Sequence, residues 1–147
     1  MENDLAYIKY LKSSELIDII SNIWGFEETS AALLELECRD PQKALHLGME
    51  ILENNKGDDY LQASVWDIVF QINPENVLNC LGKREEKMGK VLLYDILKEL
   101  NSGFYIKDIK YLPENIVKKI FQDYDDLIKE EDSEFNKEFI EFSNNFV

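Results

Sequence analysis

The chain has few of the residues that disulfide frameworks and metal sites need, with two cysteines and one histidine among 147 residues. Cys38 and Cys80 lie far apart and belong to no CxxC motif, which favours a reduced, cytoplasmic compartment over a disulfide-bonded secreted protein. A single histidine, His46, excludes an HExxH zinc motif, and the sequence has neither a GxSxG nucleophile motif nor a glycine-rich phosphate loop. We therefore predict a protein that is not an enzyme and has no catalytic residues, no metal and no cofactor.

Long apolar segments are also missing. No stretch reaches the roughly 20 apolar residues that cross a bilayer. Residues 16–23 are the most apolar run near the N-terminus, and Asp18, Ser21 and Asn22 interrupt it. Glu2 and Asp4 stand where a secretory signal would carry basic residues. We expect no membrane span, no signal peptide and a cytoplasmic location.

Basic residues are scarce: 16 lysines and arginines oppose 30 aspartates and glutamates, which gives a net charge of -14. Residues 1–40 contain nine acidic and three basic residues, residues 122–141 contain nine and two, and residues 41–121 contain twelve and eleven. This charge repels nucleic acids and anionic membranes and speeds the approach of a basic protein. The alternative is that the acidic residues only keep the surface solvated.

Each of the three prolines is the second residue of a similar six-residue segment that leads into an apolar run. The segments are DPQKAL at residues 40–45, NPENVL at 73–78 and LPENIV at 112–117. Proline suits the first turn of a helix because its φ is fixed and its missing N–H has no helical partner there. We predict a helix start at each proline, with Asp40 as an N-cap.

Apolar residues recur at helical spacing along most of the chain. The order apolar, aromatic, Asp, Ile, apolar occurs at Val65–Val69 and again at Leu93–Leu97, as expected for the second helices of two related pairs. Residues 1–147 are predicted to form a single helical repeat domain. The predicted helices cover residues 5–23 with a break at Ser13–Ser14, 29–38, 40–53, 59–72, 73–81, 87–100, 113–129 and 133–145, and residues 104–112 are predicted to be a loop or a short helix.

Four phenylalanines line the last predicted helix, namely Phe135, Phe139, Phe142 and Phe146. A terminal repeat must close the core and present a polar outer face. We therefore predict that this helix caps the C-terminal end of the repeats. The alternative is that the stripe fills a groove of a partner protein.

Two groups of polar residues have ordinary explanations. His46 precedes Glu50 by one helical turn, a spacing compatible with acid–base chemistry but also with simple pairing on an exposed helix face. The one basic cluster comprises Lys83, Arg84, Lys87 and Lys90, with Glu85 and Glu86 inside it. We predict a helix start with ion pairs at this cluster rather than an anion site.

Recognition of a partner is the remaining function, and its best candidates are Trp66 with Asp67 and Tyr94 with Asp95. Equivalent positions of successive second helices form a row on one surface, where aromatic rings supply contact area and acids select basic partners. The further candidates are Asp58, Asp59, Tyr60, Asp123, Asp125 and Asp126. The alternative is that the two aromatic rings lie between helices while the two acids face water.

Residues 40–130 resemble degenerate HEAT repeats in their paired helices, in the segment Asp58–Val65 that leads into a buried second helix, and in the repeated apolar-aromatic-Asp pattern. The resemblance implies an all-α fold: a short right-handed α-solenoid of HEAT-like helix pairs with a C-terminal capping helix. In size and acidity the chain is similar to the immunity proteins of bacterial toxin systems, including contact-dependent inhibition. This similarity implies a protein, monomeric on its own, that neutralises a cognate toxin, a basic and nuclease-like domain, by covering its active surface. The alternative is a HEAT-like scaffold or adaptor that binds another basic protein or peptide.

Overall fold

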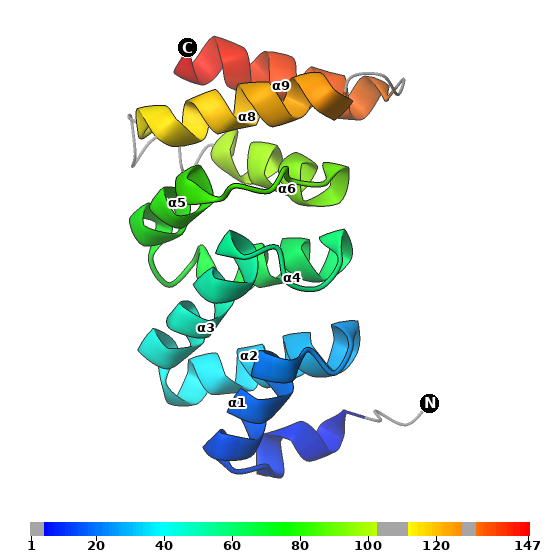
Figure 1. The fold of residues 1–147 in the computed structure, drawn as a ribbon, viewed down its shortest axis with the longest axis vertical. Helices are drawn as coiled ribbons and strands as arrows, with labels where there is room; N and C mark the ends of the chain where they lie inside the picture. The colour runs from blue at the N-terminus through cyan, green and yellow to red at the C-terminus, as the bar shows by residue number, and fades with distance from the viewer. Residues whose placement is uncertain (1–4, 103–111, 128–131) are drawn as a thin grey trace.

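The computed structural model describes residues 5–102, 112–127 and 132–147, and these residues form helices and no strand (Figure 1). The predicted all-α class is therefore confirmed. The elements in chain order are η1 (Ala6–Tyr10), α1 (Ser13–Asn22), α2 (Phe26–Arg39), α3 (Pro41–Glu53), α4 (Asp59–Val69), α5 (Pro74–Lys83), α6 (Lys90–Leu100), α8 (Glu114–Leu127) and α9 (Ser133–Phe146). None of these described helices combines the length and the apolar content that a bilayer crossing requires.

The helices pack in two series (Figure 1). In the first, α2 contacts α4, α4 contacts α6, and α6 contacts α9. In the second, α3 contacts α5, and α5 contacts α8. α4 lies at the centre of the molecule because it also contacts α3 and α5, and its Val65 and Trp66 have no exposed surface.

All three prolines stand at helix N-termini, as predicted. α3 and α5 have proline at the first helical position, and the side chains of Asp40 and Asn73 each accept a hydrogen bond from the backbone N–H of the third helical residue, at 3.2 and 3.1 Å. Pro113 directly precedes α8, and its carbonyl accepts a hydrogen bond from Val117 N at 3.3 Å. Proline and side-chain caps together satisfy the first turn of α3 and α5.

The first helical segment breaks earlier than predicted. η1 ends at Tyr10, the backbone is extended at Leu11, and α1 begins at Ser13, so the predicted break at Ser13–Ser14 is wrong by two residues. The cause is a cap that uses Glu15, whose carboxylate accepts a hydrogen bond from Lys12 N at 2.9 Å. This contact fixes the start of α1 directly after residue 12.

Two other helix starts also differ from the prediction. α2 begins at Phe26 rather than at residue 29, because Gly25 serves as the N-cap of α2. α6 begins at Lys90 rather than at residue 87, because residues 84–89 are held in a loop by the side chain of Arg84. The predicted loop or short helix at 104–112 lies, apart from Leu112, outside the described residues.

α3 presents its predicted apolar face to the core and approaches α4 closely. The buried residues of α3 include Ala44, Leu45, Gly48, Ile51 and Leu52. A Cβ atom at Gly48 would collide with the Val69 side chain of α4. Glycine in a helix interior is less favourable than alanine by roughly 0.5 to 1 kcal/mol, so its place here reflects the close approach of the two helices.

The C-terminal phenylalanine stripe packs inside the protein. Phe135 and Phe142 of α9 are buried. Phe139 stacks on Tyr124 of α8 with ring centroids 3.6 Å apart, and Phe121 meets the same phenylalanine edge-on at 4.9 Å. α9 thus covers α8 and α6 with this stripe, as expected for a closing helix, and the phenylalanines are not free to fill the groove of a partner.

A buried guanidinium joins several segments of the chain. The Arg84 side chain is only 4% exposed, and it follows directly after α5. Its five N–H groups donate to Leu52 O (2.7 Å), Gln62 Oε1 (2.7 Å), Asn55 Oδ1 (3.0 Å), Glu86 O (2.9 Å) and Lys87 O (2.9 Å). These oxygens belong to the end of α3, the α3–α4 turn, α4 and the loop before α6, and every donor of the guanidinium is satisfied.

The basic cluster therefore has two kinds of residue. Lys87 and Lys90 form ion pairs, but with two acids that lie outside the cluster, Asp126 at 2.6 Å and Asp132 at 2.8 Å. Arg84 makes no ion pair with a described residue, since its five partners are carbonyl and amide oxygens, and the ion-pair prediction is wrong for it. Burial lowers the pKa of this guanidinium, which stays ionised because arginine does not lose its proton in proteins.

Replacement of Arg84 by alanine is predicted to lower the free energy of unfolding by roughly 3 to 5 kcal/mol, because it removes five hydrogen bonds at once from the inside of the protein. Arg84→Lys should recover only part of the loss, since an ammonium has three donors and no planar fork. Urea denaturation measures the free energy of unfolding of both variants. Lys83→Ala, at the adjacent exposed position, is the matched control and should change stability by less than about 0.5 kcal/mol. A loss below about 1 kcal/mol for Arg84→Ala would contradict the structural role assigned to Arg84.

Candidate partner-binding site

The structure brings together the two acids of the predicted row, from helices α4 and α6 that lie side by side (Figure 1). Near the N-terminal ends of both helices, the Asp59 carboxylate of α4 accepts hydrogen bonds from Val91 N (2.7 Å) and Leu92 N (3.0 Å) of α6. Further along both helices, the Asp67 carboxyl of α4 hydrogen-bonds to the Asp95 carboxyl of α6. α4 and α6 therefore run in the same direction, and equivalent positions on them are neighbours.

The carboxyl pair formed by Asp67 and Asp95 carries an unbalanced negative charge. Burial, and then the hydrogen bond and the charge of Asp67, raise the pKa of Asp95 to about 7. On α6 itself, Lys98 acts to lower this pKa and Glu99 acts to raise it. Asp67 is exposed and Asp95 half-buried, and neither makes an ion pair with a described residue. Near neutral pH the two carboxyls thus hold a proton that is easily lost, and no basic side chain forms an ion pair with either.

The two aromatic residues of the row are less exposed to a partner than Asp67. Trp66 has no exposed surface and stacks on Phe70 with ring centroids 4.3 Å apart, so its selection as a partner-binding residue is wrong and the alternative of a ring between helices is correct. Tyr94 is half-buried, meets the edge of Phe135 at 6.2 Å and has the Lys98 ammonium 5.3 Å from its ring centre. Within the row, Asp67 is exposed, Tyr94 and Asp95 are half-buried, and Trp66 is buried.

Asp58 and Asp59 serve the fold. The Asp58 carboxylate caps α4 by accepting a hydrogen bond from Leu61 N at 2.8 Å. Asp59 caps the start of α6, as described above, so both carboxylates already have partners within the chain. Tyr60 lies beside them and is 65% exposed. Of these three candidates, Tyr60 is the residue that a partner can reach without breaking a cap.

The three candidate aspartates of α8 differ in exposure. Asp123 is 4% exposed, accepts a hydrogen bond from Met88 N at 3.0 Å and pairs with Lys119 at 3.2 Å, so it is part of the interior. Its selection as an acid that meets a partner is therefore wrong. Asp125 and Asp126 are exposed, and the latter pairs with Lys87.

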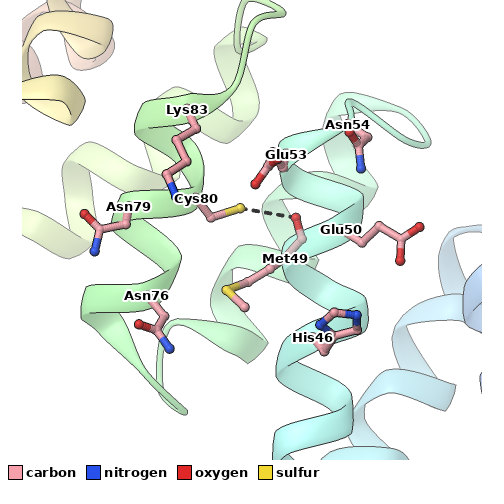
Figure 2. A pocket seen from close by; sticks show the side chains of 9 residues that line it. All are labelled: His46, Met49, Glu50, Glu53, Asn54, Asn76, Asn79, Cys80 and Lys83. Atoms are coloured by element: carbon pink, nitrogen blue, oxygen red, sulfur yellow. Dashed lines mark hydrogen bonds between the residues drawn. The ribbon is translucent and has the colours of Figure 1, made fainter.

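A cavity of about 550 Å³ between α3 and α5 contains the single histidine, as Figure 2 shows. The Cys80 thiol also lines this cavity and donates a hydrogen bond to Met49 O at 3.2 Å. Burial raises the pKa of this thiol to about 12. Glu50 accepts a hydrogen bond from Lys56 at 2.8 Å, which lowers the pKa of Glu50. No hydrogen bond joins His46 to Glu50 among the described residues. Near neutral pH the Cys80 thiol is therefore protonated and the Glu50 carboxyl is ionised.

Within the described ranges, no three side chains of histidine, cysteine, aspartate or glutamate are grouped so that they could hold a metal ion.

The sequence analysis did not select Tyr7 and Trp24, which line a cavity of about 280 Å³ together with Leu11, Glu15, Asp18 and Ile19. We call this the N-terminal cavity. Trp24 is 57% exposed. A usable signal was present: Gly25 directly follows Trp24, and because glycine commonly ends a helix, the tryptophan is expected in a connection, outside any apolar helix face.

No family model, curated protein or solved structure matches the chain.

Stability should fall as the pH rises through the range in which Asp95 titrates. Because its pKa is raised from 3.8 to about 7, the folded protein holds a proton that the unfolded chain lacks between these values. The stabilisation is complete below pH 3.8 and is lost as the pH rises to about 7, with a slope of at most about 1.4 kcal/mol per pH unit for one proton.

Urea denaturation at intervals between about pH 5 and pH 8 tests this linkage. The free energy of unfolding of Asp95→Asn should not show this fall with rising pH, because the introduced amide would stay neutral and keep its hydrogen bond to Asp67 at every pH. Asp125→Asn, at an exposed position, is the control and should retain the wild-type dependence. Identical pH dependence in wild type and Asp95→Asn would show that the carboxyl pair does not share a proton.

The two cysteines should differ in reactivity. Both are free, Cys38 exposed and Cys80 buried with its raised pKa. Iodoacetamide near pH 8 should modify Cys38 in the folded protein and should modify Cys80 only after unfolding in urea, because the thiolate is the reactive form. Mass spectrometry of the intact protein and its peptides measures both sites. Equal rates without denaturant would contradict the burial of Cys80.

Proposed function

We propose that the helices form a right-handed α-solenoid of HEAT-like pairs, closed by α9. The order of contacts supports this arrangement, because each helix of the two series packs on the next helix of its own series. Polar contacts join the first series at equivalent positions: the Ser30 hydroxyl of α2 bonds the Ser64 hydroxyl of α4 at 2.9 Å, and Asp59 of α4 caps α6. In this arrangement α2, α4 and α6 contribute one continuous face.

On this basis we propose that the protein binds a basic partner protein and acts as an immunity protein. It neutralises a cognate toxin, a basic and nuclease-like domain, by covering the toxin's active surface. The observation that carries the proposal is the carboxyl pair: the fold holds Asp67 and Asp95 together, and neither makes an ion pair with a described residue. Two adjacent carboxyls repel when both are ionised, so a cation supplied by a partner relieves that repulsion.

The overall charge supports the same kind of partner. The net charge of -14 includes large acidic excesses in residues 1–40 and 122–141. A field of this sign raises the association rate of a basic protein from about 10⁵ to 10⁶ M⁻¹s⁻¹ toward 10⁸ M⁻¹s⁻¹ at low salt. Exposed acids such as Asp125 act on this rate, whereas the carboxyl pair acts on the lifetime of the complex. We also propose a cytoplasmic location, supported by the two unpaired cysteines.

Co-expression tests the proposal. The candidate toxin is the product of the gene immediately upstream, since toxin and immunity genes are neighbours. This product should be toxic alone and harmless beside the wild-type protein at equal expression. The double variant Asp67→Asn, Asp95→Asn should lose protection, because loss of one side of a desolvated charge pair costs roughly 2 to 5 kcal/mol of binding free energy.

Asp125→Asn is the control for loss of an acid outside the carboxyl pair, because it removes an exposed acid that lies on α8. It should slow association and weaken its salt dependence while protection persists. If the upstream product is harmless alone, or if wild-type protein leaves its toxicity unchanged, the immunity function is wrong. A HEAT-like scaffold or adaptor for another basic protein or peptide then replaces it.

A further inference from the structure

Aromatic side chains are exposed together at the N-terminal end of the protein. The exposed rings are Tyr7 (43%), Tyr10 (80%), Trp24 (57%) and Phe26 (47%). They come from η1, from the connection between α1 and α2, and from the first residue of α2. Exposed aromatic rings with neighbouring charges are typical of the central residues of binding sites.

Two of these rings line the N-terminal cavity, of about 280 Å³. Tyr7 comes from η1 and Trp24 from the residues after α1, so two separate segments supply the aromatic walls. Leu11 and Ile19 add apolar surface. The indole N–H of Trp24 and the hydroxyl of Tyr7 have no hydrogen-bond partner among the described residues, which leaves both polar groups available to a ligand.

The same cavity carries two carboxylates, Glu15 and Asp18, three residues apart on α1 and thus on one side of the helix. Neutral donors position each of them: Lys12 N donates to Glu15 Oε1 at 2.9 Å, and Asn22 Nδ2 donates to Asp18 Oδ1 at 2.8 Å. One oxygen of each carboxylate remains without a hydrogen bond from the described residues. Neither carboxylate makes an ion pair within that part of the chain.

Arg39, which contacts the backbone of the cavity residue Leu11, does not pair with the two carboxylates in the described structure. Arg39 donates to Leu11 O (2.7 Å) and Lys9 O (2.9 Å), and it pairs with Glu35 at 3.0 Å. It therefore fastens the residues around η1 to α2. The structure supplies a cavity with two aromatic walls and two uncompensated carboxylates, held in place by contacts that leave its interior open.

We propose that the N-terminal cavity binds an arginine side chain of the basic partner, an inference that rests on the proposed function and names a second point of contact. A guanidinium stacks on aromatic faces and bonds two carboxylate oxygens at once, whereas a lysine ammonium is a strongly hydrated point charge. The apolar stem of the arginine packs on Leu11 and Ile19. Its charge balances Glu15 and Asp18, which the fold leaves without a cation.

Binding of a hexa-arginine peptide, measured by anisotropy of a dye-labelled peptide at about 0.15 M salt, tests the cavity directly. The variant Glu15→Gln, Asp18→Asn should weaken binding by roughly tenfold or more, since it removes both charges but keeps the oxygens that accept the two neutral hydrogen bonds. Its helical circular dichroism and melting temperature should match those of the wild type. Hexa-lysine should bind the wild type several-fold more weakly than hexa-arginine.

The matched control is Glu27→Gln, Glu37→Gln, which removes the same charge from α2 at residues that do not line the cavity. It should change hexa-arginine binding by less than about twofold. Trp24 gives a second readout, because the other tryptophan, Trp66, is buried: saturating hexa-arginine should change the emission of the wild type and leave that of Trp24→Phe unchanged.

Equal weakening in the control and cavity variants would overturn the inference, because general charge attraction would then explain binding. Equal affinities for hexa-lysine and hexa-arginine, or unchanged Trp24 emission at saturation, would also overturn it. These results do not involve the upstream gene product. Failure of the cavity is therefore distinct from failure of the immunity function, which depends on protection by the wild-type protein.

Discussion

The buried guanidinium of Arg84 is the contact on which the arrangement of the central helices depends. With five hydrogen bonds it holds the end of α3, the α3–α4 turn, α4 and the loop before α6 in one place. Lys119 and Asp123 of α8 hold the same loop from the other side, through Glu86 O at 3.0 Å and Met88 N at 3.0 Å. Because buried polar groups require such complete pairing, the chain has few other ways to place this loop.

A fixed loop determines how α6 lies against α4, and this in turn produces the candidate site. α6 starts where Asp59 caps it, so the N-terminal ends of the two helices lie side by side, and further along them Asp67 contacts Asp95. The polar groups around Arg84 are thus hydrogen-bonded within the protein, whereas the carboxyl pair holds two groups that repel when both are ionised. Local unfavourable interactions of this kind are maintained by the surrounding structure and are typical of functional sites. The N-terminal cavity has the same character, with two carboxylates positioned by neutral donors and without an ion pair in the described chain.

Helical periodicity and proline positions predicted the helices well because both act locally, through the backbone of a few residues. The repeated pattern also predicted that Asp67 and Asp95 are neighbours, since equivalent positions of aligned helices meet. Burial was harder to predict: Trp66 is inside because α4 is covered by several helices, which the pattern of one helix does not reveal. Arg84 and Asp123 lie in the interior because of partners that are distant in sequence. The exposed Trp24 follows Ile23, a residue with a left-handed φ of 50° that no propensity predicts for a β-branched side chain.

In the proposed complex, a basic side chain of the partner replaces the proton of the carboxyl pair. Titration calorimetry of the complex with the upstream gene product, in two buffers of different ionisation enthalpy, measures the protons released on binding. With a pKa of about 7 for Asp95, wild-type protein should release about half a proton per complex at pH 7, and Asp95→Asn should bind more weakly without that release. An equal proton release by Asp95→Asn, or none by the wild type, would contradict the account.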